Sequence, residues 1–350
     1  MMEFYVVNPA LEIIGIVDTY KSAIWTERYY SSGDFELYVP ASAEMLNLLQ
    51  KQNFVVRVDD LTKAMIIESI KLTTDADSGD YLTVTGRSIS SILSRRIVWT
   101  QTTYVGNLEQ AVRRMVTDNL ISPEDNERGI SGITLGAEAG LTDEIQIQFL
   151  GDVVETAIQG LCKAHGIGYA LRMDLANRQM SFELYKGVDR SYNQNVTPFV
   201  VFSDDFENLL SSEYSNNDAR FANVAQVAGE GEGVARKKVV VGSATGLARF
   251  EVFVDAKGQS TNGGELDETT YASLLRQKGT EKLATLYSTE NVDGKVAPNH
   301  IYKLGVDYFI GDLVQVINEY GISMTPRVTE VIECQNEQGY TCIPTFAQDD

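Results

Sequence analysis

The sequence has few of the residues that most often carry chemistry. Cysteine occurs three times and histidine twice in 350 residues. Three cysteines are too few for a disulfide framework in a chain of this length, so we expect free thiols and synthesis in a reducing cytosol. His165 and His300 are the only imidazoles, so the sequence has few candidate residues for a histidine-dependent hydrolase or a zinc site.

Long apolar runs are also missing. The longest apolar stretches, such as residues 199–202, have the length of a strand, whereas a membrane helix needs about 18 or more apolar residues. Residues 1–4 lack the basic start and the small-residue cleavage site of a signal peptide. We therefore expect neither a membrane span nor an export signal.

Basic residues are outnumbered by acidic ones. The chain has 29 Lys and Arg against 49 Asp and Glu, which gives a net charge of −20 and a pI near 4.5. Because a protein that binds duplex DNA needs basic residues to neutralise phosphates, this balance argues against specific nucleic-acid binding. The apolar fraction of 43% is that of a globular protein, and the length suffices for two or three domains.

Residues 1–100 have the pattern of a β domain. In 34–39 apolar and polar side chains alternate, which predicts a half-buried strand. The stretches 55–58 and 65–68 flank a turn and predict a hairpin. Two short helices are expected to interrupt the strands, one capped by Ser42 and one at 88–93.

Residues 101–200 combine helices and strands. Asn107 is expected to cap a helix with one apolar face. Asp152 and Glu155 form a D-x-x-E start that is similar to a capping box, and Gly166 is expected to end that second helix. Alternation predicts strands at 145–149, 168–173 and 180–185.

After Pro198 the chain returns to strands. One long helix is expected to begin after the cap Asp267, with Gly279 weakening its middle. From about 300 the pattern is β to the end. Short apolar or alternating runs predict strands at 223–229, 238–241 and 250–254.

Two parts of the chain resemble each other. Each has a strand, a turn, a strand with a Glu among β-branched residues, a turn with Gly, and a strand that opens with Tyr. This order favours an internal duplication, with a chance likeness of two antiparallel meanders as the alternative. The matching segments are 55–58, 66–70 and 81–84 in the first part, and 313–316, 328–332 and 340–343 in the second.

The candidate metal and thiol sites are weak. Cys162 and His165 have the spacing of two ligands on one helical face, but no second Cys/His pair completes a tetrahedral site. We expect His165 to cap the last helical turn before Gly166 instead. Cys334 and Cys342 could be neighbours across a final hairpin, where we expect them to be thiols packed as small hydrophobes.

No other segment supplies a catalytic set. The acidic stretch 75–80 lacks the Glu that a calcium loop needs at its twelfth position, so we expect a hairpin turn. The glycine-rich stretches 229–233 and 242–246 lack the Lys of a phosphate-binding loop. Asp204 and Asp205 would point to opposite faces of one strand. We therefore predict no catalytic, cofactor-binding or metal-binding residues and a protein that is not an enzyme.

An ordered set of stretches resembles the tail hub proteins of siphophages and phage-derived tails. The set spans nearly the whole chain. It consists of 25–37 (WTERYYSSGDFEL), 227–233 (VAGEGEG), 249–255 (RFEVFVD), 307–314 (DYFIGDLV) and 327–331 (RVTEV).

The resemblance implies a structural protein of the tail tip or baseplate, similar in architecture to the trimeric hub of contractile phage tails. Three subunits with two related tube-type β-barrels each would form a ring that matches the six-fold tail tube. The implied partners are the tail tube or distal tail protein ring, the central spike or tip and the tape measure protein. The implied location is the virion tail, assembled in the host cytoplasm.

The resulting fold class is mainly β with α+β insertions. The predicted parts are a first barrel at 1–100, an α+β domain at 101–200, a second barrel at 201–242 and 300–350, and an inserted segment at 243–299 with one long helix. Because the chain stops soon after the last strand, we expect no C-terminal peptidase, lysozyme or fibre. An acidic channel would let DNA pass without binding it.

Two other classes of function stay open. A tail-associated cell-wall or polysaccharide hydrolase would work through Asp/Glu pairs and would show a cleft with two carboxylates ~5–10 Å apart. A β-rich adhesion module for glycans would show an exposed patch of Trp and Tyr. The sequence has only Trp25 and Trp99 for such a patch, but 17 tyrosines.

Overall fold

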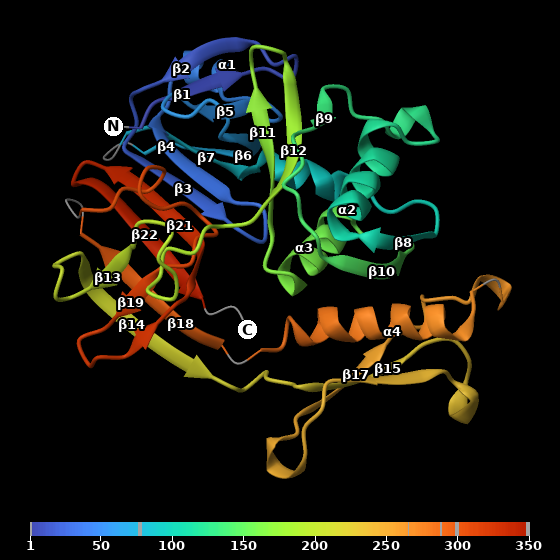
Figure 1. Ribbon diagram of the computed structural model, residues 1–350. Helices are drawn as coiled ribbons and strands as arrows, with labels where there is room; N and C mark the ends of the chain where they lie inside the picture. Colours follow the sequence, from blue (N-terminus) through green and yellow to red (C-terminus); the bar gives the residue numbers. More distant parts are fainter. Residues whose placement is uncertain (1, 76–78, 265, 288, 298–300, 348–350) are drawn as a thin grey trace.

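The protein is built around one large antiparallel sheet, to which segments from both ends of the chain contribute (Figure 1). The computed structural model describes residues 2–75, 79–264, 266–287, 289–297 and 301–347. Two mixed helix-and-strand units flank the sheet. In the described part of the chain, no helix is both long and apolar enough to cross a membrane.

The first module covers residues 4–88 and lies on a core of aromatic and aliphatic side chains. Phe4 stacks on Trp25 with ring centroids 5.8 Å apart, and Phe35 lies 6.3 Å beyond Trp25. Ser42 caps the short helix by accepting a hydrogen bond from the Met45 amide, as predicted. The elements are β1 (Phe4–Val7), β2 (Ile13–Val17), β3 (Ser22–Arg28), β4 (Asp34–Pro40), α1 (Ala43–Leu48), β5 (Phe54–Arg57), β6 (Ala64–Thr73) and β7 (Tyr81–Ser88).

An α+β unit follows, drawn in green in Figure 1. Asn107 caps α2 by accepting from the Gln110 amide, which confirms that prediction. Gly166, with a positive φ of 63°, follows the end of α3. The elements are η1 (Ile89–Arg95), β8 (Thr102–Asn107), α2 (Leu108–Val116), η2 (Thr117–Ile121), η3 (Asn126–Arg128), β9 (Ile133–Leu135), β10 (Glu144–Phe149), α3 (Val154–Ala164), β11 (Gly168–Asp174) and β12 (Gln179–Tyr185).

The predicted capping box at the start of α3 is wrong. Val153 is the N-cap residue, and its side chain forms no capping hydrogen bond. Glu155 is buried instead and accepts hydrogen bonds from Ser32 of the β3–β4 turn and from Tyr169 of β11. The Glu155 carboxylate therefore makes tertiary hydrogen bonds and not the capping-box hydrogen bond that its spacing predicts.

The second module returns to the large sheet. Its core contains Phe202, Tyr308 and Phe346, with Phe202 5.3 Å from Tyr308 and 5.2 Å from Phe346 between ring centroids. The three strands β13, β19 and β20 form a small sheet beside the large one. The elements are β13 (Val201–Ser203), β14 (Leu209–Asn217), β18 (Thr289–Val296), β19 (Gln315–Ile317), β20 (Ser323–Met324), β21 (Arg327–Asn336) and β22 (Gly339–Ala347).

A unit with the long helix is inserted between β14 and β18. Asp267 caps the helix by accepting from the Thr270 amide, as predicted. The prediction divided this region at 242/243, but β15 pairs with both β16 and β17 and holds them in one sheet beside α4. The insertion therefore begins before β15 and ends before β18. The elements are β15 (Val224–Ala228), η4 (Gly233–Ala235), β16 (Lys238–Val241), η5 (Gly246–Ala248), β17 (Glu251–Asp255), η6 (Asn262–Gly264) and α4 (Glu268–Leu283).

Gly279 has a packing role in this helix. A Cβ at this position would lie 2.6 Å from Val241 and 2.8 Å from Val227. The helix runs through Gly279 without a break. The glycine, predicted to weaken the helix, thus lets α4 approach the sheet closely.

The two modules share a strand order. Across the large sheet the order is β14-β18-β22-β21-β3-β4-β7-β6-β5-β1-β2, so β3-β4-β7-β6 in the first module matches β14-β18-β22-β21 in the second. Both modules have a bulge at the same place, between Ile67 and Ser69 of β6 and between Val328 and Glu330 of β21. The likeness of the two parts of the sequence therefore extends to topology.

The register across the strands also matches. In each module we start at the residue before the bulge and follow its paired residue on each next strand, which gives a row of four residues. The rows are Ile67, Gly86, Phe35 and Trp25 in the first module, and Val328, Phe346, Val292 and Tyr214 in the second.

The mainly β fold class with α+β insertions is confirmed, but strand pairing among the described residues closes neither module into a barrel. The free side of β3 pairs with β21 of the other module, from Arg28 opposite Glu330 to Ser22 opposite Asn336. That edge is used to join the modules, and the sheet stays open at β2 and β14.

All three cysteines are thiols in this structure. Cys342 lies opposite Glu333, whereas Cys334 lies opposite Thr341. Because neighbouring residues of a strand point to opposite faces, the two sulfurs lie on different sides of the sheet and cannot bond without rearrangement. Thiol counting under denaturing, non-reducing conditions should find three groups per chain; a count of one would contradict this geometry.

Candidate functional site

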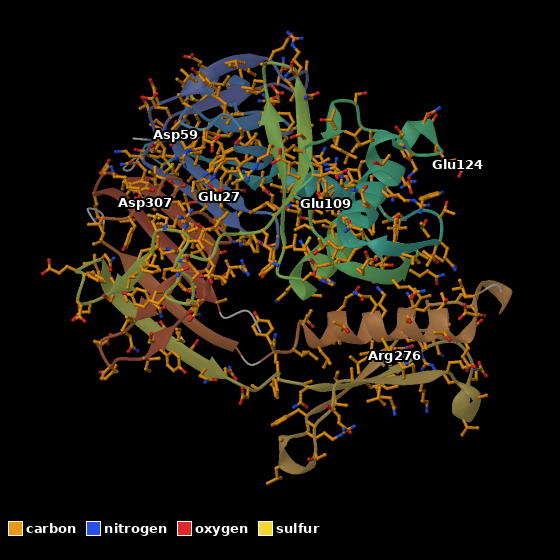
Figure 2. The ribbon with its side chains drawn as sticks, in the orientation of Figure 1. Glu27, Asp59, Glu109, Glu124, Arg276 and Asp307 are labelled. Carbon is orange, nitrogen blue, oxygen red and sulfur yellow. The ribbon has the colours of Figure 1, made fainter. Side chains whose placement is uncertain are left out.

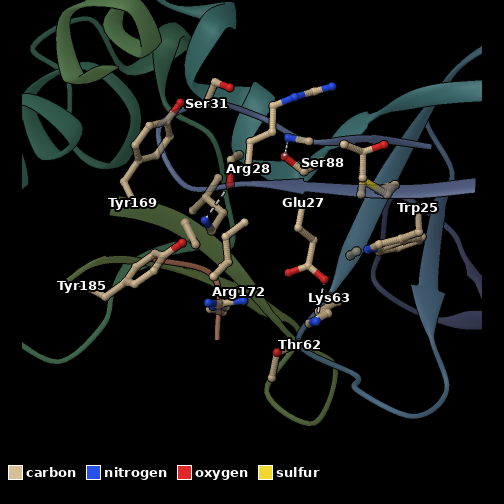
Figure 3. Close-up of a pocket in the computed structure, with 18 residues that line it drawn as sticks. Trp25, Glu27, Arg28, Ser31, Thr62, Lys63, Ser88, Tyr169, Arg172 and Tyr185 are labelled. Carbon is tan, nitrogen blue, oxygen red and sulfur yellow. Dashed lines mark hydrogen bonds and ion pairs between the residues drawn. The ribbon is translucent and has the colours of Figure 1, made fainter. Parts of the chain in front are cut away.

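A small pocket lies between the first module and the α+β unit, and Figure 3 shows its lining. Lys63 and Glu27 form an ion pair of 2.5 Å in its wall. Burial lowers the pKa of Lys63, but the charge and hydrogen bond of Glu27 outweigh burial and raise it. The cavity has a volume of about 60 Å³. This pocket is part of a structural junction and is too small for a substrate.

Tyr29 joins three parts of the molecule. It is fully buried in the turn between β3 and β4. Its hydroxyl lies 3.1 Å from the Gly166 carbonyl and accepts a 3.3 Å hydrogen bond from the Gly187 amide. Arg327 of the second module lies over its ring at 5.2 Å. A Cβ at Gly311 would lie 2.3 Å from the ring, so the backbone of the second module packs directly against this side chain.

Asp312 ties the second module to the segment that follows β12. The side chain is 2% exposed. Its carboxylate accepts from the Val188 amide at 2.7 Å, from the Phe309 amide at 3.0 Å and from Arg190 at 2.7 Å. Gly311 and Asp312, which lie in the 307–314 stretch, therefore have a structural function.

A buried ion pair links the modules across the sheet. Arg57 of β5 and Glu333 of β21 lie 3.1 Å apart with side chains 6% and 7% exposed, and Asp59 and Tyr340 complete their hydrogen bonds. Burial lowers the pKa of Arg57, but Asp59 and Glu333 outweigh burial and hold it above its ordinary value. Burial and the Glu333 charge raise the pKa of Tyr340. The Arg57 guanidinium also lies 5.7 Å from the centre of the Trp25 ring.

A polar pocket of about 610 Å³ lies at the outer end of the α+β unit, where Figure 2 places Glu124. Trp99 is 62% exposed at its edge and stacks on Arg128 at 5.0 Å. Asp118 and Asp125 also line it. Trp99 supplies one exposed ring of the Trp and Tyr patch expected of a glycan-binding surface, and none of the described tyrosines lines this pocket.

A wider cleft of about 940 Å³ opens where α3, α4 and β21 meet. Among its lysine and arginine side chains, Arg28, Lys163 and Arg327 already have partners. Arg28 pairs with Asp34 and Glu330, and Lys163 lies over Tyr287 at 4.8 Å. The cleft therefore offers no set of free cations for a phosphate or carboxylate ligand among the residues described.

The sheet edges present apolar side chains to solvent. Edge strand β2 exposes Ile13 by 52%, Ile14 by 44% and Ile16 by 42%. Edge strand β14 exposes Leu210 by 57% and Tyr214 by 37%. An exposed edge of this kind is prone to pair with a further strand, which makes both ends of the sheet candidate assembly surfaces.

The weak candidates from the sequence do not assemble into a site. Cys162 is buried in the α+β core, where burial raises its pKa. His165 is the C-cap of α3 as predicted, but its Nδ1 contacts Asp143 at 3.2 Å instead of the free carbonyls. In the described part of the chain, no three His, Cys, Asp or Glu side chains are grouped to hold a metal ion.

The remaining candidates lie in connections. Asp204 and Asp205 are in a turn after β13 and not on a strand. The stretch 229–233 links β15 to β16, and 242–246 links β16 to β17. Within 75–80, residues 76–78 lie outside the described residues.

The family of the chain follows from one comparison. The model of the siphovirus ReqiPepy6 Gp37-like proteins matches residues 3–346. The chain belongs to this family. A siphophage tail origin, expected from the ordered stretches, is thereby confirmed. A comparison with curated protein sequences gives no match.

Solved structures of phage tail proteins share the fold of this Gp37-like protein. A tail protein from Neisseria meningitidis MC58 has a TM-score of 0.62 at 14% identity, with 99% of this chain and 97% of that chain covered. The 43 kDa tail protein of prophage MuSo2 from Shewanella oneidensis has 0.63 at 12% identity, covering 100% and 99%. Prophage tail protein gp18 from Listeria monocytogenes EGD-e has 0.56 at 13%, covering 99% and 94%.

Sequence reasoning missed the residues that join the parts of the Gp37-like chain. Tyr29, Asp312 and Glu333 have no local signal, because each acts on segments far away in the sequence. Tyr29 and Asp312 do lie within stretches that carry the family resemblance. That overlap is the one signal that could have singled them out.

Proposed function

We propose that this protein is the structural hub at the distal end of a siphophage or phage-like tail. Three copies form a ring of pseudo-six-fold symmetry that joins the tail tube, or the distal tail protein ring, to the central spike or tip. The ring encloses a channel through which DNA or the tape measure protein passes. The protein acts as a scaffold without catalysis.

The repeated module carries the proposal. Matched strand order, matched bulges and matched register give each chain two similar units in one sheet. A ring of three subunits meets a six-fold tube without mismatch only if each subunit offers two equivalent surfaces. In the assembled ring the modules of three chains would stand side by side, joined edge to edge.

The place of the protein in the tail can be tested by labelling. Leu247, in the loop between β16 and β17, is fully exposed, so a peptide tag inserted there should leave both modules intact. Electron microscopy of tails with gold-labelled antibody should find the label at the end away from the capsid. Label along the tube or on the capsid would refute the hub assignment.

The acidic surface leads to a prediction about DNA. Arg236 and Lys237, two members of the single basic run, already pair with Asp255 and Glu268. A ring of chains that each have a net charge of −20 should repel the phosphate backbone. In about 0.15 M salt, filter binding should retain no duplex DNA; retention that falls steeply as salt rises would contradict the prediction.

Glycan binding is a second candidate function, favoured by Trp99 and the carboxylates around it. It would place a weak cell-surface contact on the α+β unit beside the hub function. A glycan array should lose its signal with Trp99→Ala and keep it with Trp25→Phe, because Trp25 is buried. No binding by the unchanged protein would dismiss this candidate.

A further inference from the structure

The junction between the two modules has two components on β21. Before the bulge, β21 pairs with the segment that leads into β19: the Val328 amide donates to the Asp312 carbonyl at 2.9 Å. After the bulge, the same edge pairs with β3 from Glu330 to Asn336. One edge of β21 is therefore shared between its own module and the other.

Strand β6, the counterpart of β21, is covered along only part of the same edge. Strand β5 pairs with residues 64–66, and the Ile67 amide donates to the Asn53 carbonyl. After the bulge, the structure pairs residues 69–73 with β7 on one side. No described strand lies on their other side.

Strand β14, the counterpart of β3, is the end strand of the sheet. Where β3 lies between β4 and β21, β14 has β18 as its neighbour strand. Each chain thus makes the β3–β21 junction once and leaves open both halves of a second one. The open halves are β14 and residues 69–73.

We propose that β14 of one copy pairs antiparallel with residues 69–73 of β6 in the next copy. This inference rests on the proposed ring and names the contact that closes it. The partner is a second copy of this chain because the matching junction already exists within each copy. Six similar junctions would then run around three subunits, alternately within and between chains.

The matched rows fix the register of the contact. Within the chain, Trp25 of β3 lies opposite Glu333 of β21. Tyr214 has the same position in its row as Trp25. Leu72 follows Ile67, the residue before the bulge in β6, at the same distance along the strand as Glu333 follows Val328 in β21. Leu72 therefore corresponds to Glu333. Tyr214 should therefore lie opposite Leu72 of the neighbouring copy.

The side chains suit this register. Leu72 is 48% and Tyr214 is 37% exposed, and the contact would cover both. On the other face Thr73 would lie opposite Glu213, which places Lys71 diagonal to Glu213. An apolar pair on one face and an opposite-charge pair on the other favour this register over one shifted by a single residue, which would separate both pairs.

Disulfide trapping in assembled tails tests the contact. Residues directly opposite in an antiparallel pair have Cα atoms about 4.5–5.5 Å apart, within the range of a disulfide. Tails with Leu72→Cys and Tyr214→Cys in the same chain should give covalent dimers and trimers on a non-reducing gel after mild oxidation. Each single variant should give none.

The chain offers a matched internal control. Ile24 lies opposite the native Cys334, so Ile24→Cys should form a bridge within one chain at the position that corresponds to Glu213 and Thr73. A second pair, Thr73→Cys with Glu213→Cys, tests the same register while Leu72 and Tyr214 stay intact. Covalent trimers from either inter-copy pair support the proposal.

Failure of the contact can be told from failure of the hub assignment. A bridge between Ile16→Cys of β2 and Tyr214→Cys, with none from the two proposed pairs, would overturn the contact and assign it to the other free edge. No bridge from any pair in tails that carry the gold label at their distal end would also overturn it. Tails without that label would refute the hub proposal itself.

Discussion

Replacing Tyr29 by alanine should lower the free energy of unfolding by about 3–5 kcal/mol, the cost typical of removing a large buried aromatic side chain. The ring is fully buried and packs against Tyr185 with ring centroids 5.3 Å apart. The hydroxyl bonds to Gly166 and Gly187 would also be lost. Because the side chain touches three parts of the molecule, its loss should loosen all of them.

Two variants calibrate this measurement by urea denaturation. Tyr29→Phe keeps the ring and removes the hydroxyl, so it should cost about 1–3 kcal/mol. Tyr320 is 83% exposed, and Tyr320→Ala should change stability by less than about 0.5 kcal/mol. If Tyr29→Ala were as mild as Tyr320→Ala, Tyr29 would not join the parts of the molecule.

Replacing Glu333 by alanine should cost about 3–5 kcal/mol, since removing one partner of a buried ion pair leaves the other charge uncompensated. Arg57 would remain with a side chain that is 6% exposed. Asp59, itself 62% exposed, would still hold part of the guanidinium, which favours the lower end of that range. The effect should appear as a lower urea midpoint.

A surface pair and a double variant serve as controls. Lys21 and Glu337 form an ion pair with side chains 45% and 73% exposed, so Glu337→Ala should shift the urea midpoint far less than Glu333→Ala does. Arg57→Met with Glu333→Leu should recover most of the loss, because an apolar pair leaves no buried charge. A loss as large in the double variant as in Glu333→Ala would show that the charge imbalance is not the cause.

Local patterns predicted the elements well. The caps Asn107 and Asp267 and the strand alternation of β4 depend on neighbours within a few residues, and the structure has them. The family resemblance and the mainly β class are also confirmed. These features are encoded in short stretches, where periodicity and capping chemistry determine the local structure.

Strand partners could not be predicted in the same way. Arg28 and Glu330 meet across 302 residues, and no local pattern says that β3 joins β21. For the same reason β16, predicted in the second barrel, lies with β17 in the insertion. The sequence presents Glu155 and Gly279 as local helix signals, whereas tertiary packing determines the function of both.

A cryo-EM reconstruction of the distal tail end tests the central claim most directly. The account predicts three copies of the chain around the channel, six similar modules, and β14 of each copy continuing into residues 69–73 of the next. It also predicts that the β3–β21 junction and the junction between copies superimpose. A ring with another number of subunits, or two modules per chain in unlike surroundings, would contradict it.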